Sequence, residues 1–372
     1  MKMKLEDIDP NLKQAEIGRV DLDFIPVDQK PIELDGLPFW EQEHKFLRIP
    51  EAEIPRVSFG VGELATNTSG VQARFRTDSP VLAIRAKLRY APYHGKMPVV
   101  GSCGFDVYAG TGLAKRFLRA IGPTTGMQEY GGLCYDFRSY KGVPYSPMAD
   151  VIPGTNLREI TINFPLYNGV EYVEIGLMPG SRLEAPAPFA IEKPIVFYGS
   201  SITQGGCVSR PGNHYVLHIS RRLNANIVSQ GYSGNAKGEV VMADIMSRIP
   251  MSVFVFDYDH NAPNIEHLRR THYPFYRYFR ERCPNVPIVF ASNTSPALDM
   301  KRWYDRLGVI RENYERAYAE GDRRVVFLDG TSIFSEPYSD ACTVDGCHPN
   351  DLGFFRMADS FERAIREALA LI

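Results

Sequence analysis

The clearest indication of the fold comes from residues 195–206, Ile195-Val196-Phe197-Tyr198-Gly199-Ser200-Ser201-Ile202-Thr203-Gln204-Gly205-Gly206. Its first four residues are apolar, which is typical of a short strand buried on both faces of a parallel sheet. A turn rich in Gly and Ser follows, and a helix is expected to start there. A buried strand that leads through a tight turn into a helix is the opening unit of a βα repeat.

The same alternation of strand and helix continues to the end of the chain. Five apolar runs are each followed by a helical stretch, and right-handed crossovers between parallel strands predict a doubly wound α/β domain. The predicted strands are 195–198, 226–229, 253–258, 286–291 and 325–328, and the predicted helices lie near 212–224, 237–248, 264–282, 299–320 and 351–371.

The chain before residue 190 has a different period. Its short runs alternate apolar and polar residues and are separated by Gly, Pro, Asn and Asp, as in antiparallel sheets. The clearest of these runs are 70–77, 81–88, 105–108, 158–164 and 171–177. Many short strands with turns between them predict a β-sandwich or jelly roll. We therefore expect an accessory β-domain over residues 1–190 and an α/β domain over residues 191–372.

The balance of charges excludes some partners. The 372 residues include 42 Lys and Arg against 44 Asp and Glu, which gives a formal net charge of −2, and neither half of the chain is basic. A nucleic acid is therefore not an expected partner. The content of 44% hydrophobic residues is typical of a globular protein rather than of a disordered one.

The N-terminal residues and the cysteines indicate the cellular compartment in which the protein is expected. The charged start Met1–Asp7 is not followed by an apolar segment, and no apolar run approaches the roughly 18 residues that a membrane span requires. Six cysteines without a CxxC pair indicate neither a disulfide scaffold nor structural zinc. We expect a cytoplasmic protein with no membrane partner.

Active sites of doubly wound sheets lie at the carboxyl ends of the strands, so the residues after each strand are the candidates. Ser201 follows the first strand and could act as a nucleophile, or the turn could be structural. Gly234 follows the second strand, where its N–H could donate to an oxyanion or simply form a turn. Asn261 follows the third strand, where its amide could donate to an oxyanion or cap a helix.

The segment before the last helix supplies a base and an acid. Histidine is the side chain that titrates nearest neutral pH, so His348 could take a proton from a serine and return it to a leaving group. Asp345 lies three residues earlier, and it could accept from the other ring nitrogen and fix the tautomer. A DxxH pattern alone is also common at helix starts.

Two other groups could indicate a metal. Asp257, Asp259 and His260 lie together after the third strand, but no further ligand with suitable spacing accompanies them. His214 and His218 are four residues apart, and packing in a helix accounts for them without a metal. The sequence therefore predicts no metal and no organic cofactor.

Taken together, these blocks resemble the SGNH, or GDSL-type, hydrolase family, whose members cleave esters with a Ser-His-Asp site. The resemblance implies a flavodoxin-like five-stranded parallel sheet. It also implies that Ser201 is the nucleophile, that His348 and Asp345 are the base and the orienting acid, and that Ser201, Gly234 and Asn261 form the oxyanion hole. Two positions depart from the family pattern, because Ser200 stands where Asp is usual and His260 where Gly is usual.

The first half of the chain extends the resemblance. Gly104-Phe105-Asp106-Val107-Tyr108 is similar to the GxDLY signature of a β-sandwich domain that precedes one branch of the family. The segments 201–205, 209–212 and 345–354 also resemble that branch. The accessory domain could be a carbohydrate-binding module or a wall of the active-site cleft, and we favour the wall.

The implied activity is hydrolysis of a short-chain acyl ester, in particular an acetyl ester, on a carbohydrate or a small alcohol. One alternative is an acyltransferase that uses the same acyl-enzyme with an acceptor other than water. Another is a carbohydrate-binding protein without activity. Cys207 and Cys347 lie near the predicted nucleophile and base, and they are interpreted either as a pair that approach each other or as two separate buried thiols.

Overall fold

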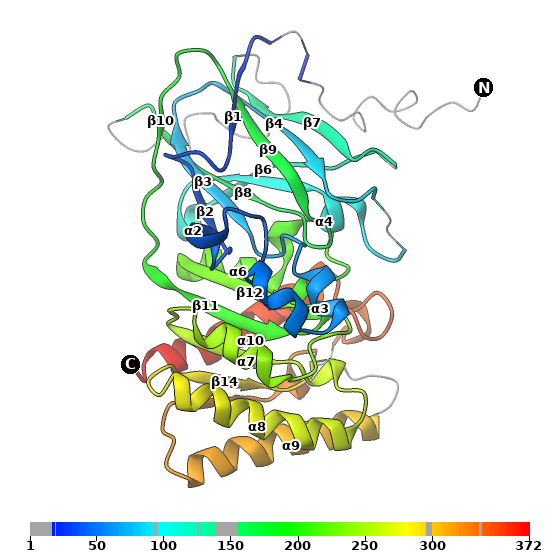
Figure 1. Cartoon of the computed structure of the whole chain (residues 1–372). Helices are drawn as coiled ribbons and strands as arrows, with labels where there is room; N and C mark the ends of the chain where they lie inside the picture. Colours follow the sequence, from blue (N-terminus) through cyan, green and yellow to red (C-terminus); the bar gives the residue numbers. More distant parts are fainter. Residues whose placement is uncertain are drawn as a thin grey trace, which may run out of the picture.

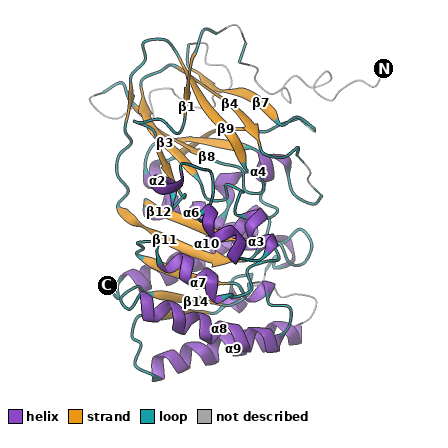
Figure 2. Ribbon diagram, in the orientation of Figure 1, coloured by secondary structure: helices purple, strands orange, loops and turns teal. Residues whose placement is uncertain are grey.

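The computed structural model describes residues 17–18, 20–92, 95–124, 126–138, 155–294, 300–334 and 337–372. Two bodies are stacked on each other (Figure 1). The upper body consists of antiparallel strands from the first half of the chain, and the lower body consists of the helices and parallel strands of the second half. Figure 2 shows an upper body made mostly of strands and a lower body in which most of the helices surround the parallel strands.

The second half forms a five-stranded parallel sheet, as the sequence predicted. The strand order is β12-β11-β13-β14-β15, so the chain starts in β11, moves to one neighbour and then progresses on the other side. This is the flavodoxin-like order, which has its switch point beside the first strand. The strands are β11 (Ile191–Gly199), β12 (Ala225–Gly231), β13 (Val253–Asp257), β14 (Ile288–Ala291) and β15 (Val325–Leu328).

Helices cover both faces of this sheet. Because side chains alternate along a strand, Val196 and Tyr198 of β11 lie in the core with α7, α8 and α9, whereas Ile195 and Phe197 lie in the core with α6 and α10. This double burial explains the continuous apolar character of the strands. The helices are α5 (Ser201–Gln204), α6 (Tyr215–Leu223), α7 (Val240–Ser247), α8 (Ile265–Arg282), α9 (Met300–Ala319) and α10 (Asp351–Leu369).

The first half forms a β-sandwich, as predicted. One sheet has the order β1-β9-β4-β7, and the other has the order β10-β3-β8-β5-β6 with β2 paired to β3. Apolar side chains of both sheets, such as Phe75, Ile84 and Ile175, share one core. The strands are β1 (Asp23–Pro26), β2 (Glu33–Asp35), β3 (Gln72–Thr77), β4 (Val81–Leu88), β5 (Phe105–Ala109), β6 (Arg116–Ile121), β7 (Glu129–Asp136), β8 (Arg158–Asn163), β9 (Val170–Leu177) and β10 (Leu183–Glu184).

Several elements of the first half lack the pattern that would predict them. β6 carries exposed Arg116 and Phe117, and β7 contains Gly131 and Gly132, so neither strand shows a clear alternation. Three short helices also lie here: α2 (Trp40–Glu43), α3 (Phe59–Leu64) and α4 (Val99–Cys103). At four to six residues, they are too short for a helical period to emerge.

Part of the first half packs into the α/β core. Phe39, Ile49, Val61 and Ala65 belong to the same apolar cluster as Tyr198. The α3 helix accordingly lies beside the parallel sheet, well below the sandwich (Figure 1). The two halves of the chain therefore share part of one hydrophobic core, in addition to the contacts between their surfaces. Among the described residues, no helix is both long and apolar enough to span a membrane.

Candidate active site

Ser201 is the first residue of α5, directly after β11. The preceding Ser200 caps this helix, since its hydroxyl accepts a hydrogen bond from the Ile202 N–H at 3.1 Å. The Ser201 carbonyl accepts from the Gly206 N–H and from the Tyr167 hydroxyl, both at 2.9 Å. The backbone on both sides of the Ser201 hydroxyl is therefore held in place.

The Ser201 hydroxyl faces the imidazole of His348. The distance from Ser201 Oγ to His348 Nε2 is 2.9 Å, and His348 Nδ1 lies 3.0 Å from Oδ2 of Asp345. These three side chains, which lie up to 147 residues apart in the sequence, thus form one hydrogen-bonded chain. The structure brings the predicted nucleophile, base and acid together in that order.

The Asp345–His348 segment is a compact turn. Oδ1 of Asp345 accepts from the backbone N–H groups of Cys347 and His348, at 3.1 and 2.8 Å. Gly346 has a φ of +81°, a left-handed conformation that glycine adopts without strain. This turn leaves Oδ2 of the same carboxylate for the imidazole. The next helix, α10, starts three residues after His348 and is capped by Asn350.

The accessory domain contributes a cation to this carboxylate. Nζ of Lys96, in the segment between β4 and α4, lies 3.2 Å from Oδ2 of Asp345. Burial alone would raise the pKa of Asp345, but the hydrogen bonds from His348 and Lys96 outweigh it and hold that pKa well below its usual value. Asp345 is therefore an anion at neutral pH, as an orienting acid must be.

Gly234 and Asn261 lie at the carboxyl ends of β12 and β13, the two strands that flank β11. Gly234 is exposed and has a φ of +69°. Asn261 donates from Nδ2 to the Tyr232 carbonyl at 2.8 Å, which joins the two loops. Within the described chain neither residue hydrogen-bonds to Ser201, so their part in an oxyanion hole stays a prediction.

A pocket of about 270 Å³ opens beside the His348 ring. Both halves of the chain line it, and the accessory half supplies Lys96, Met97 and Tyr167. This arrangement agrees with the interpretation of that half as a wall of the cleft. The full lining is Gly95, Lys96, Met97, Tyr167, Gly206, Cys207, Ser233, Asp345 and His348.

The two acidic residues, Asp257 at the end of β13 and Asp259 just after it, make separate contacts rather than gather around a common centre. Asp257 accepts from Thr203 Oγ1 at 3.2 Å and from the Tyr215 hydroxyl at 3.4 Å, beneath the nucleophile turn. Asp259 instead accepts from the Asn293 N–H at 3.0 Å. In the part of the chain that the structure describes, no group of three His, Cys, Asp or Glu side chains could hold a metal ion.

The two spaced histidines lie in packed surroundings. His214 is fully buried, and its ring packs edge-on against Tyr215 and Phe354. His218 Nδ1 lies 2.8 Å from a guanidinium nitrogen of Arg221. Their environments fit the structural interpretation of this pair.

The two cysteines near the site are separate thiols. Cys207 is buried and lines the pocket, whereas Cys347 is partly exposed and has its sulfur 3.9 Å from Nδ1 of His260. Burial raises the pKa of Cys207 to about 11, which keeps it protonated at neutral pH.

Lys96 and Tyr167, which hydrogen-bond to Asp345 and to the Ser201 carbonyl, are two site residues that the sequence did not predict. Each comes from a loop of the accessory domain without a local motif. The sequence indicated them only indirectly, because both lie in the half of the chain whose GxDLY-type motif resembles this branch of the hydrolase family.

Comparisons with known proteins agree with this architecture. A model of the GDSL-like lipase/acylhydrolase family matches residues 192–366, and a model of the GxDLY N-terminus of SGNH-hydrolase-type esterases matches residues 22–183. No curated protein matches the sequence.

Solved structures resemble nearly the whole chain. A protein described as a GDSL-like lipase from Bacteroides ovatus is 25% identical, with a TM-score of 0.81 over 94% of this chain and 98% of its own. The salicylyl-acyltransferase SsfX3 of a tetracycline biosynthetic pathway is 19% identical, with a TM-score of 0.72 over 93% and 97%. A family two carbohydrate esterase from Cellvibrio japonicus is 12% identical, with a TM-score of 0.61 over 94% and 99%. At 19% and 12% sequence identity, the similarity to the acyltransferase and to the carbohydrate esterase shows a shared fold only.

The fold and these matches define an enzyme of the serine hydrolase class that acts on ester bonds. More particularly, the chain belongs to the SGNH, or GDSL-type, hydrolase family, in the branch with an N-terminal GxDLY domain.

Proposed function

We propose that this protein hydrolyses short-chain acyl esters, in particular acetyl esters, of a carbohydrate or small alcohol, with Ser201 as the nucleophile. The observation that carries the proposal is the chain of contacts from Ser201 Oγ to His348 Nε2, at 2.9 Å, and from His348 Nδ1 to Asp345, at 3.0 Å. A hydroxyl within hydrogen-bond reach of an imidazole that a carboxylate orients is the arrangement that activates a serine.

The proposed reaction begins when Ser201 Oγ attacks the ester carbonyl and His348 Nε2 takes its proton. Asp345 holds the other ring nitrogen protonated and stabilises the imidazolium. The oxyanion accepts from the N–H groups of Ser201 and Gly234 and from the Asn261 amide. His348 then protonates the departing alcohol, and water hydrolyses the acyl-enzyme with His348 again as the base.

The pocket, with a volume of about 270 Å³, supports a small substrate. Among its lining side chains, Met97 and Cys207 are apolar, whereas Tyr167 and Ser233 carry hydroxyl groups. A long acyl chain would require an extended apolar lining. The shared architecture with a family two carbohydrate esterase supports a sugar as the alcohol portion.

Acyl transfer is the second candidate. The observation that favours it is the architecture shared with a salicylyl-acyltransferase, whose TM-score of 0.72 exceeds that of the Cellvibrio carbohydrate esterase. Both reactions pass through the same acyl-enzyme, and they differ only in whether water or another alcohol attacks it.

The test is hydrolysis of p-nitrophenyl acetate by the wild type and by Ser201→Ala. The variant should lose turnover and labelling by a fluorophosphonate probe, while its circular dichroism spectrum stays unchanged. Ser247→Ala, at the end of α7 and remote from the pocket, is the matched control. Turnover at the wild-type rate in Ser201→Ala would exclude Ser201 as the nucleophile.

A panel of substrates then tests the acyl group and the acceptor. Rates should fall from acetyl to octanoyl p-nitrophenyl esters, and acetylated xylan or simple sugar acetates should release acetate. Accumulation of a new ester when sugars or alcohols are added would favour transfer over hydrolysis.

A further inference from the structure

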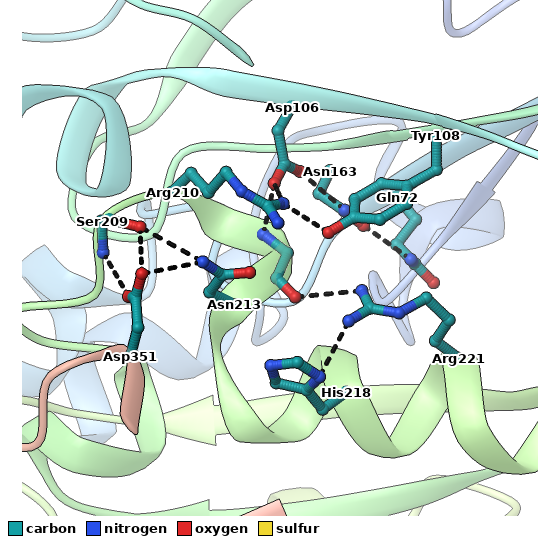
Figure 3. Close-up of polar contacts among 11 residues, drawn as sticks. Gln72, Asp106, Tyr108, Asn163, Ser209, Arg210, Asn213, His218, Arg221 and Asp351 are labelled. Atoms are coloured by element: carbon teal, nitrogen blue, oxygen red, sulfur yellow. Dashed lines mark hydrogen bonds and ion pairs between the residues drawn. The ribbon is translucent and has the colours of Figure 1, made fainter. Parts of the chain in front are cut away.

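A buried ion pair joins the GxDLY-type motif to the segment after the nucleophile. Asp106, on β5, is fully buried, and its Oδ2 lies 2.7 Å from the Arg210 guanidinium (Figure 3). The same oxygen accepts from the Gly212 N–H at 2.8 Å. Arg210 also donates to the Tyr108 hydroxyl, so both polar side chains of the motif bind this segment.

The other carboxylate oxygen of Asp106 is engaged inside the sandwich. Asn163, on β8, donates to Oδ1 of Asp106 at 2.7 Å, and Gln72, on β3, donates to Asn163 at 2.7 Å (Figure 3). Asp106 thus hydrogen-bonds to its own sheet through Oδ1. Through Oδ2 it binds Arg210 and Gly212 of the α/β domain. A buried carboxylate demands such partners, because burial without them is strongly unfavourable.

The fit between motif and segment is also steric. A Cβ on Gly212 would lie 2.5 Å from the Tyr108 hydroxyl oxygen and 2.7 Å from Oδ2 of Asp106. A Cβ on Gly101, in α4, would lie 2.0 Å from the Val208 carbonyl oxygen. Only glycine fits at both positions, so the sandwich approaches the backbone of residues 205–213 closely at two points.

The opposite side of this segment is fixed to the helix that follows His348. Oδ1 of Asp351, the first residue of α10, accepts from the Ser209 N–H at 2.8 Å. Its Oδ2 accepts from Asn213 Nδ2 at 2.9 Å and from the Ser209 hydroxyl. Figure 3 shows Asp351 on one side of the segment and Asp106 on the other.

Residues 205–213, which we call the clamp loop, form part of the active site. Gly206 and Cys207 line the pocket, and the Gly206 N–H holds the Ser201 carbonyl. Cys207 has a φ of +75°, which is unfavourable for a residue with a side chain. Surrounding contacts must therefore impose this conformation.

We propose that Asp106 and Arg210 are positioning residues of the ester-cleaving site: they hold the clamp loop so that Gly206 and Cys207 form the pocket wall beside Ser201. The accessory domain, in this view, is required for substrate binding at the active site. The inference rests on the proposed function for its kinetic readout, whereas the position of the loop can be measured without catalysis.

The test compares Asp106→Asn and Arg210→Gln with Glu53→Gln. Glu53 pairs with Arg248 across the two halves of the chain at 2.6 Å, far from the pocket, so it controls for loss of an interdomain contact. In the first two variants kcat/KM for p-nitrophenyl acetate should fall by roughly 10- to 100-fold, chiefly through KM, since a small misplacement of binding groups has that effect. The control should keep the wild-type values.

The rate of Cys207 alkylation, followed by mass spectrometry, measures directly whether the clamp loop stays in place. Its buried thiol should react slowly in the wild type and several-fold faster in Asp106→Asn and Arg210→Gln, but not in Glu53→Gln. This readout stands even if the wild type cleaves no ester, which would instead refute the proposed function. Arg210 is 21% exposed, so its variant serves if Asp106→Asn does not fold.

A double variant completes the test. If Asp106 and Arg210 act through the same loop, Asp106→Asn with Arg210→Gln should lose little more than either single variant. Additive losses, or lowered melting temperatures with unchanged KM and unchanged Cys207 reactivity, would overturn the proposal.

Discussion

The ammonium of Lys96 and the carboxylate of Asp345 lie 3.2 Å apart, although 249 residues separate them in the sequence. Oδ2 of Asp345 thus faces both Lys96 and the Nδ1 atom of His348. The two contacts differ in their surroundings, since the Lys96 side chain is 72% exposed and the His348 side chain is 31% exposed. The imidazole contact should therefore matter far more for the reaction.

Asp345→Asn tests that contact. The amide that replaces Oδ2 would donate to His348 Nδ1, which places the ring proton on Nε2 and leaves no base for Ser201. In the general Ser-His-Asp case this change lowers kcat by about 10⁴, and we expect a loss of that order in p-nitrophenyl acetate hydrolysis. Turnover within tenfold of the wild type would contradict the orienting role.

Lys96→Met is the matched control for the same oxygen. Because an exposed ion pair contributes about 1 kcal/mol or less, kcat/KM should change by no more than about fivefold. That change should shrink in 0.5 M salt, which screens exposed charges. A much larger and salt-independent loss would indicate that Lys96 contacts the substrate itself.

Asn261→Ala tests the predicted oxyanion hole. The Nδ2 group donates one hydrogen to the Tyr232 carbonyl, and its second hydrogen is the one assigned to the oxyanion. Loss of a single such donor typically lowers kcat by about 10²–10³. We expect this loss with an intact fold by circular dichroism, and a kcat within threefold of the wild type would remove Asn261 from the site.

Asp259 predicts a pH dependence of stability. Burial raises the pKa of Asp259 to about 6, from an ordinary value of 3.8. The folded protein therefore holds this proton more tightly than the unfolded chain does, so the stabilisation is complete below pH 4 and is lost as the pH rises to 6. The difference corresponds to about 3 kcal/mol in the free energy of unfolding.

Urea unfolding of the wild type and Asp259→Asn at pH 4 to 7 measures this effect. The variant cannot ionise, so its stability relative to the wild type should rise across that range. Asp244→Asn should show no such rise between pH 5 and 7, because the hydrogen bond from Arg248 lowers the pKa of Asp244 and moves its contribution to stability below pH 4. Parallel curves for Asp259→Asn and the wild type would refute the prediction.

A helix or strand could be predicted from the sequence only where its own residues carry a clear hydrophobic pattern. The apolar run 195–198 lies within β11 because burial on both faces forces continuous hydrophobicity. Strand β6 was missed because its exposed Arg116 and Phe117 interrupt the alternation. The three strand-end residues Ser201, Gly234 and Asn261 could be predicted because a general rule says where a doubly wound sheet places its site. His348 could be predicted from the DxxH pattern before the last helix. Their catalytic roles, and the domain boundary at residue 190, remain predictions.

Three features could be predicted from the amino-acid sequence: the βα repeat, the β-sandwich before it, and the set of side chains able to activate a serine. These follow from hydrophobic period and residue chemistry, which are local properties of the chain. Three contacts could be seen only in the folded protein: Lys96 with Asp345, Tyr167 with the Ser201 carbonyl, and Asp106 with Arg210. Such contacts join segments 34 to 249 residues apart, and they depend on how two bodies pack, which no local pattern encodes.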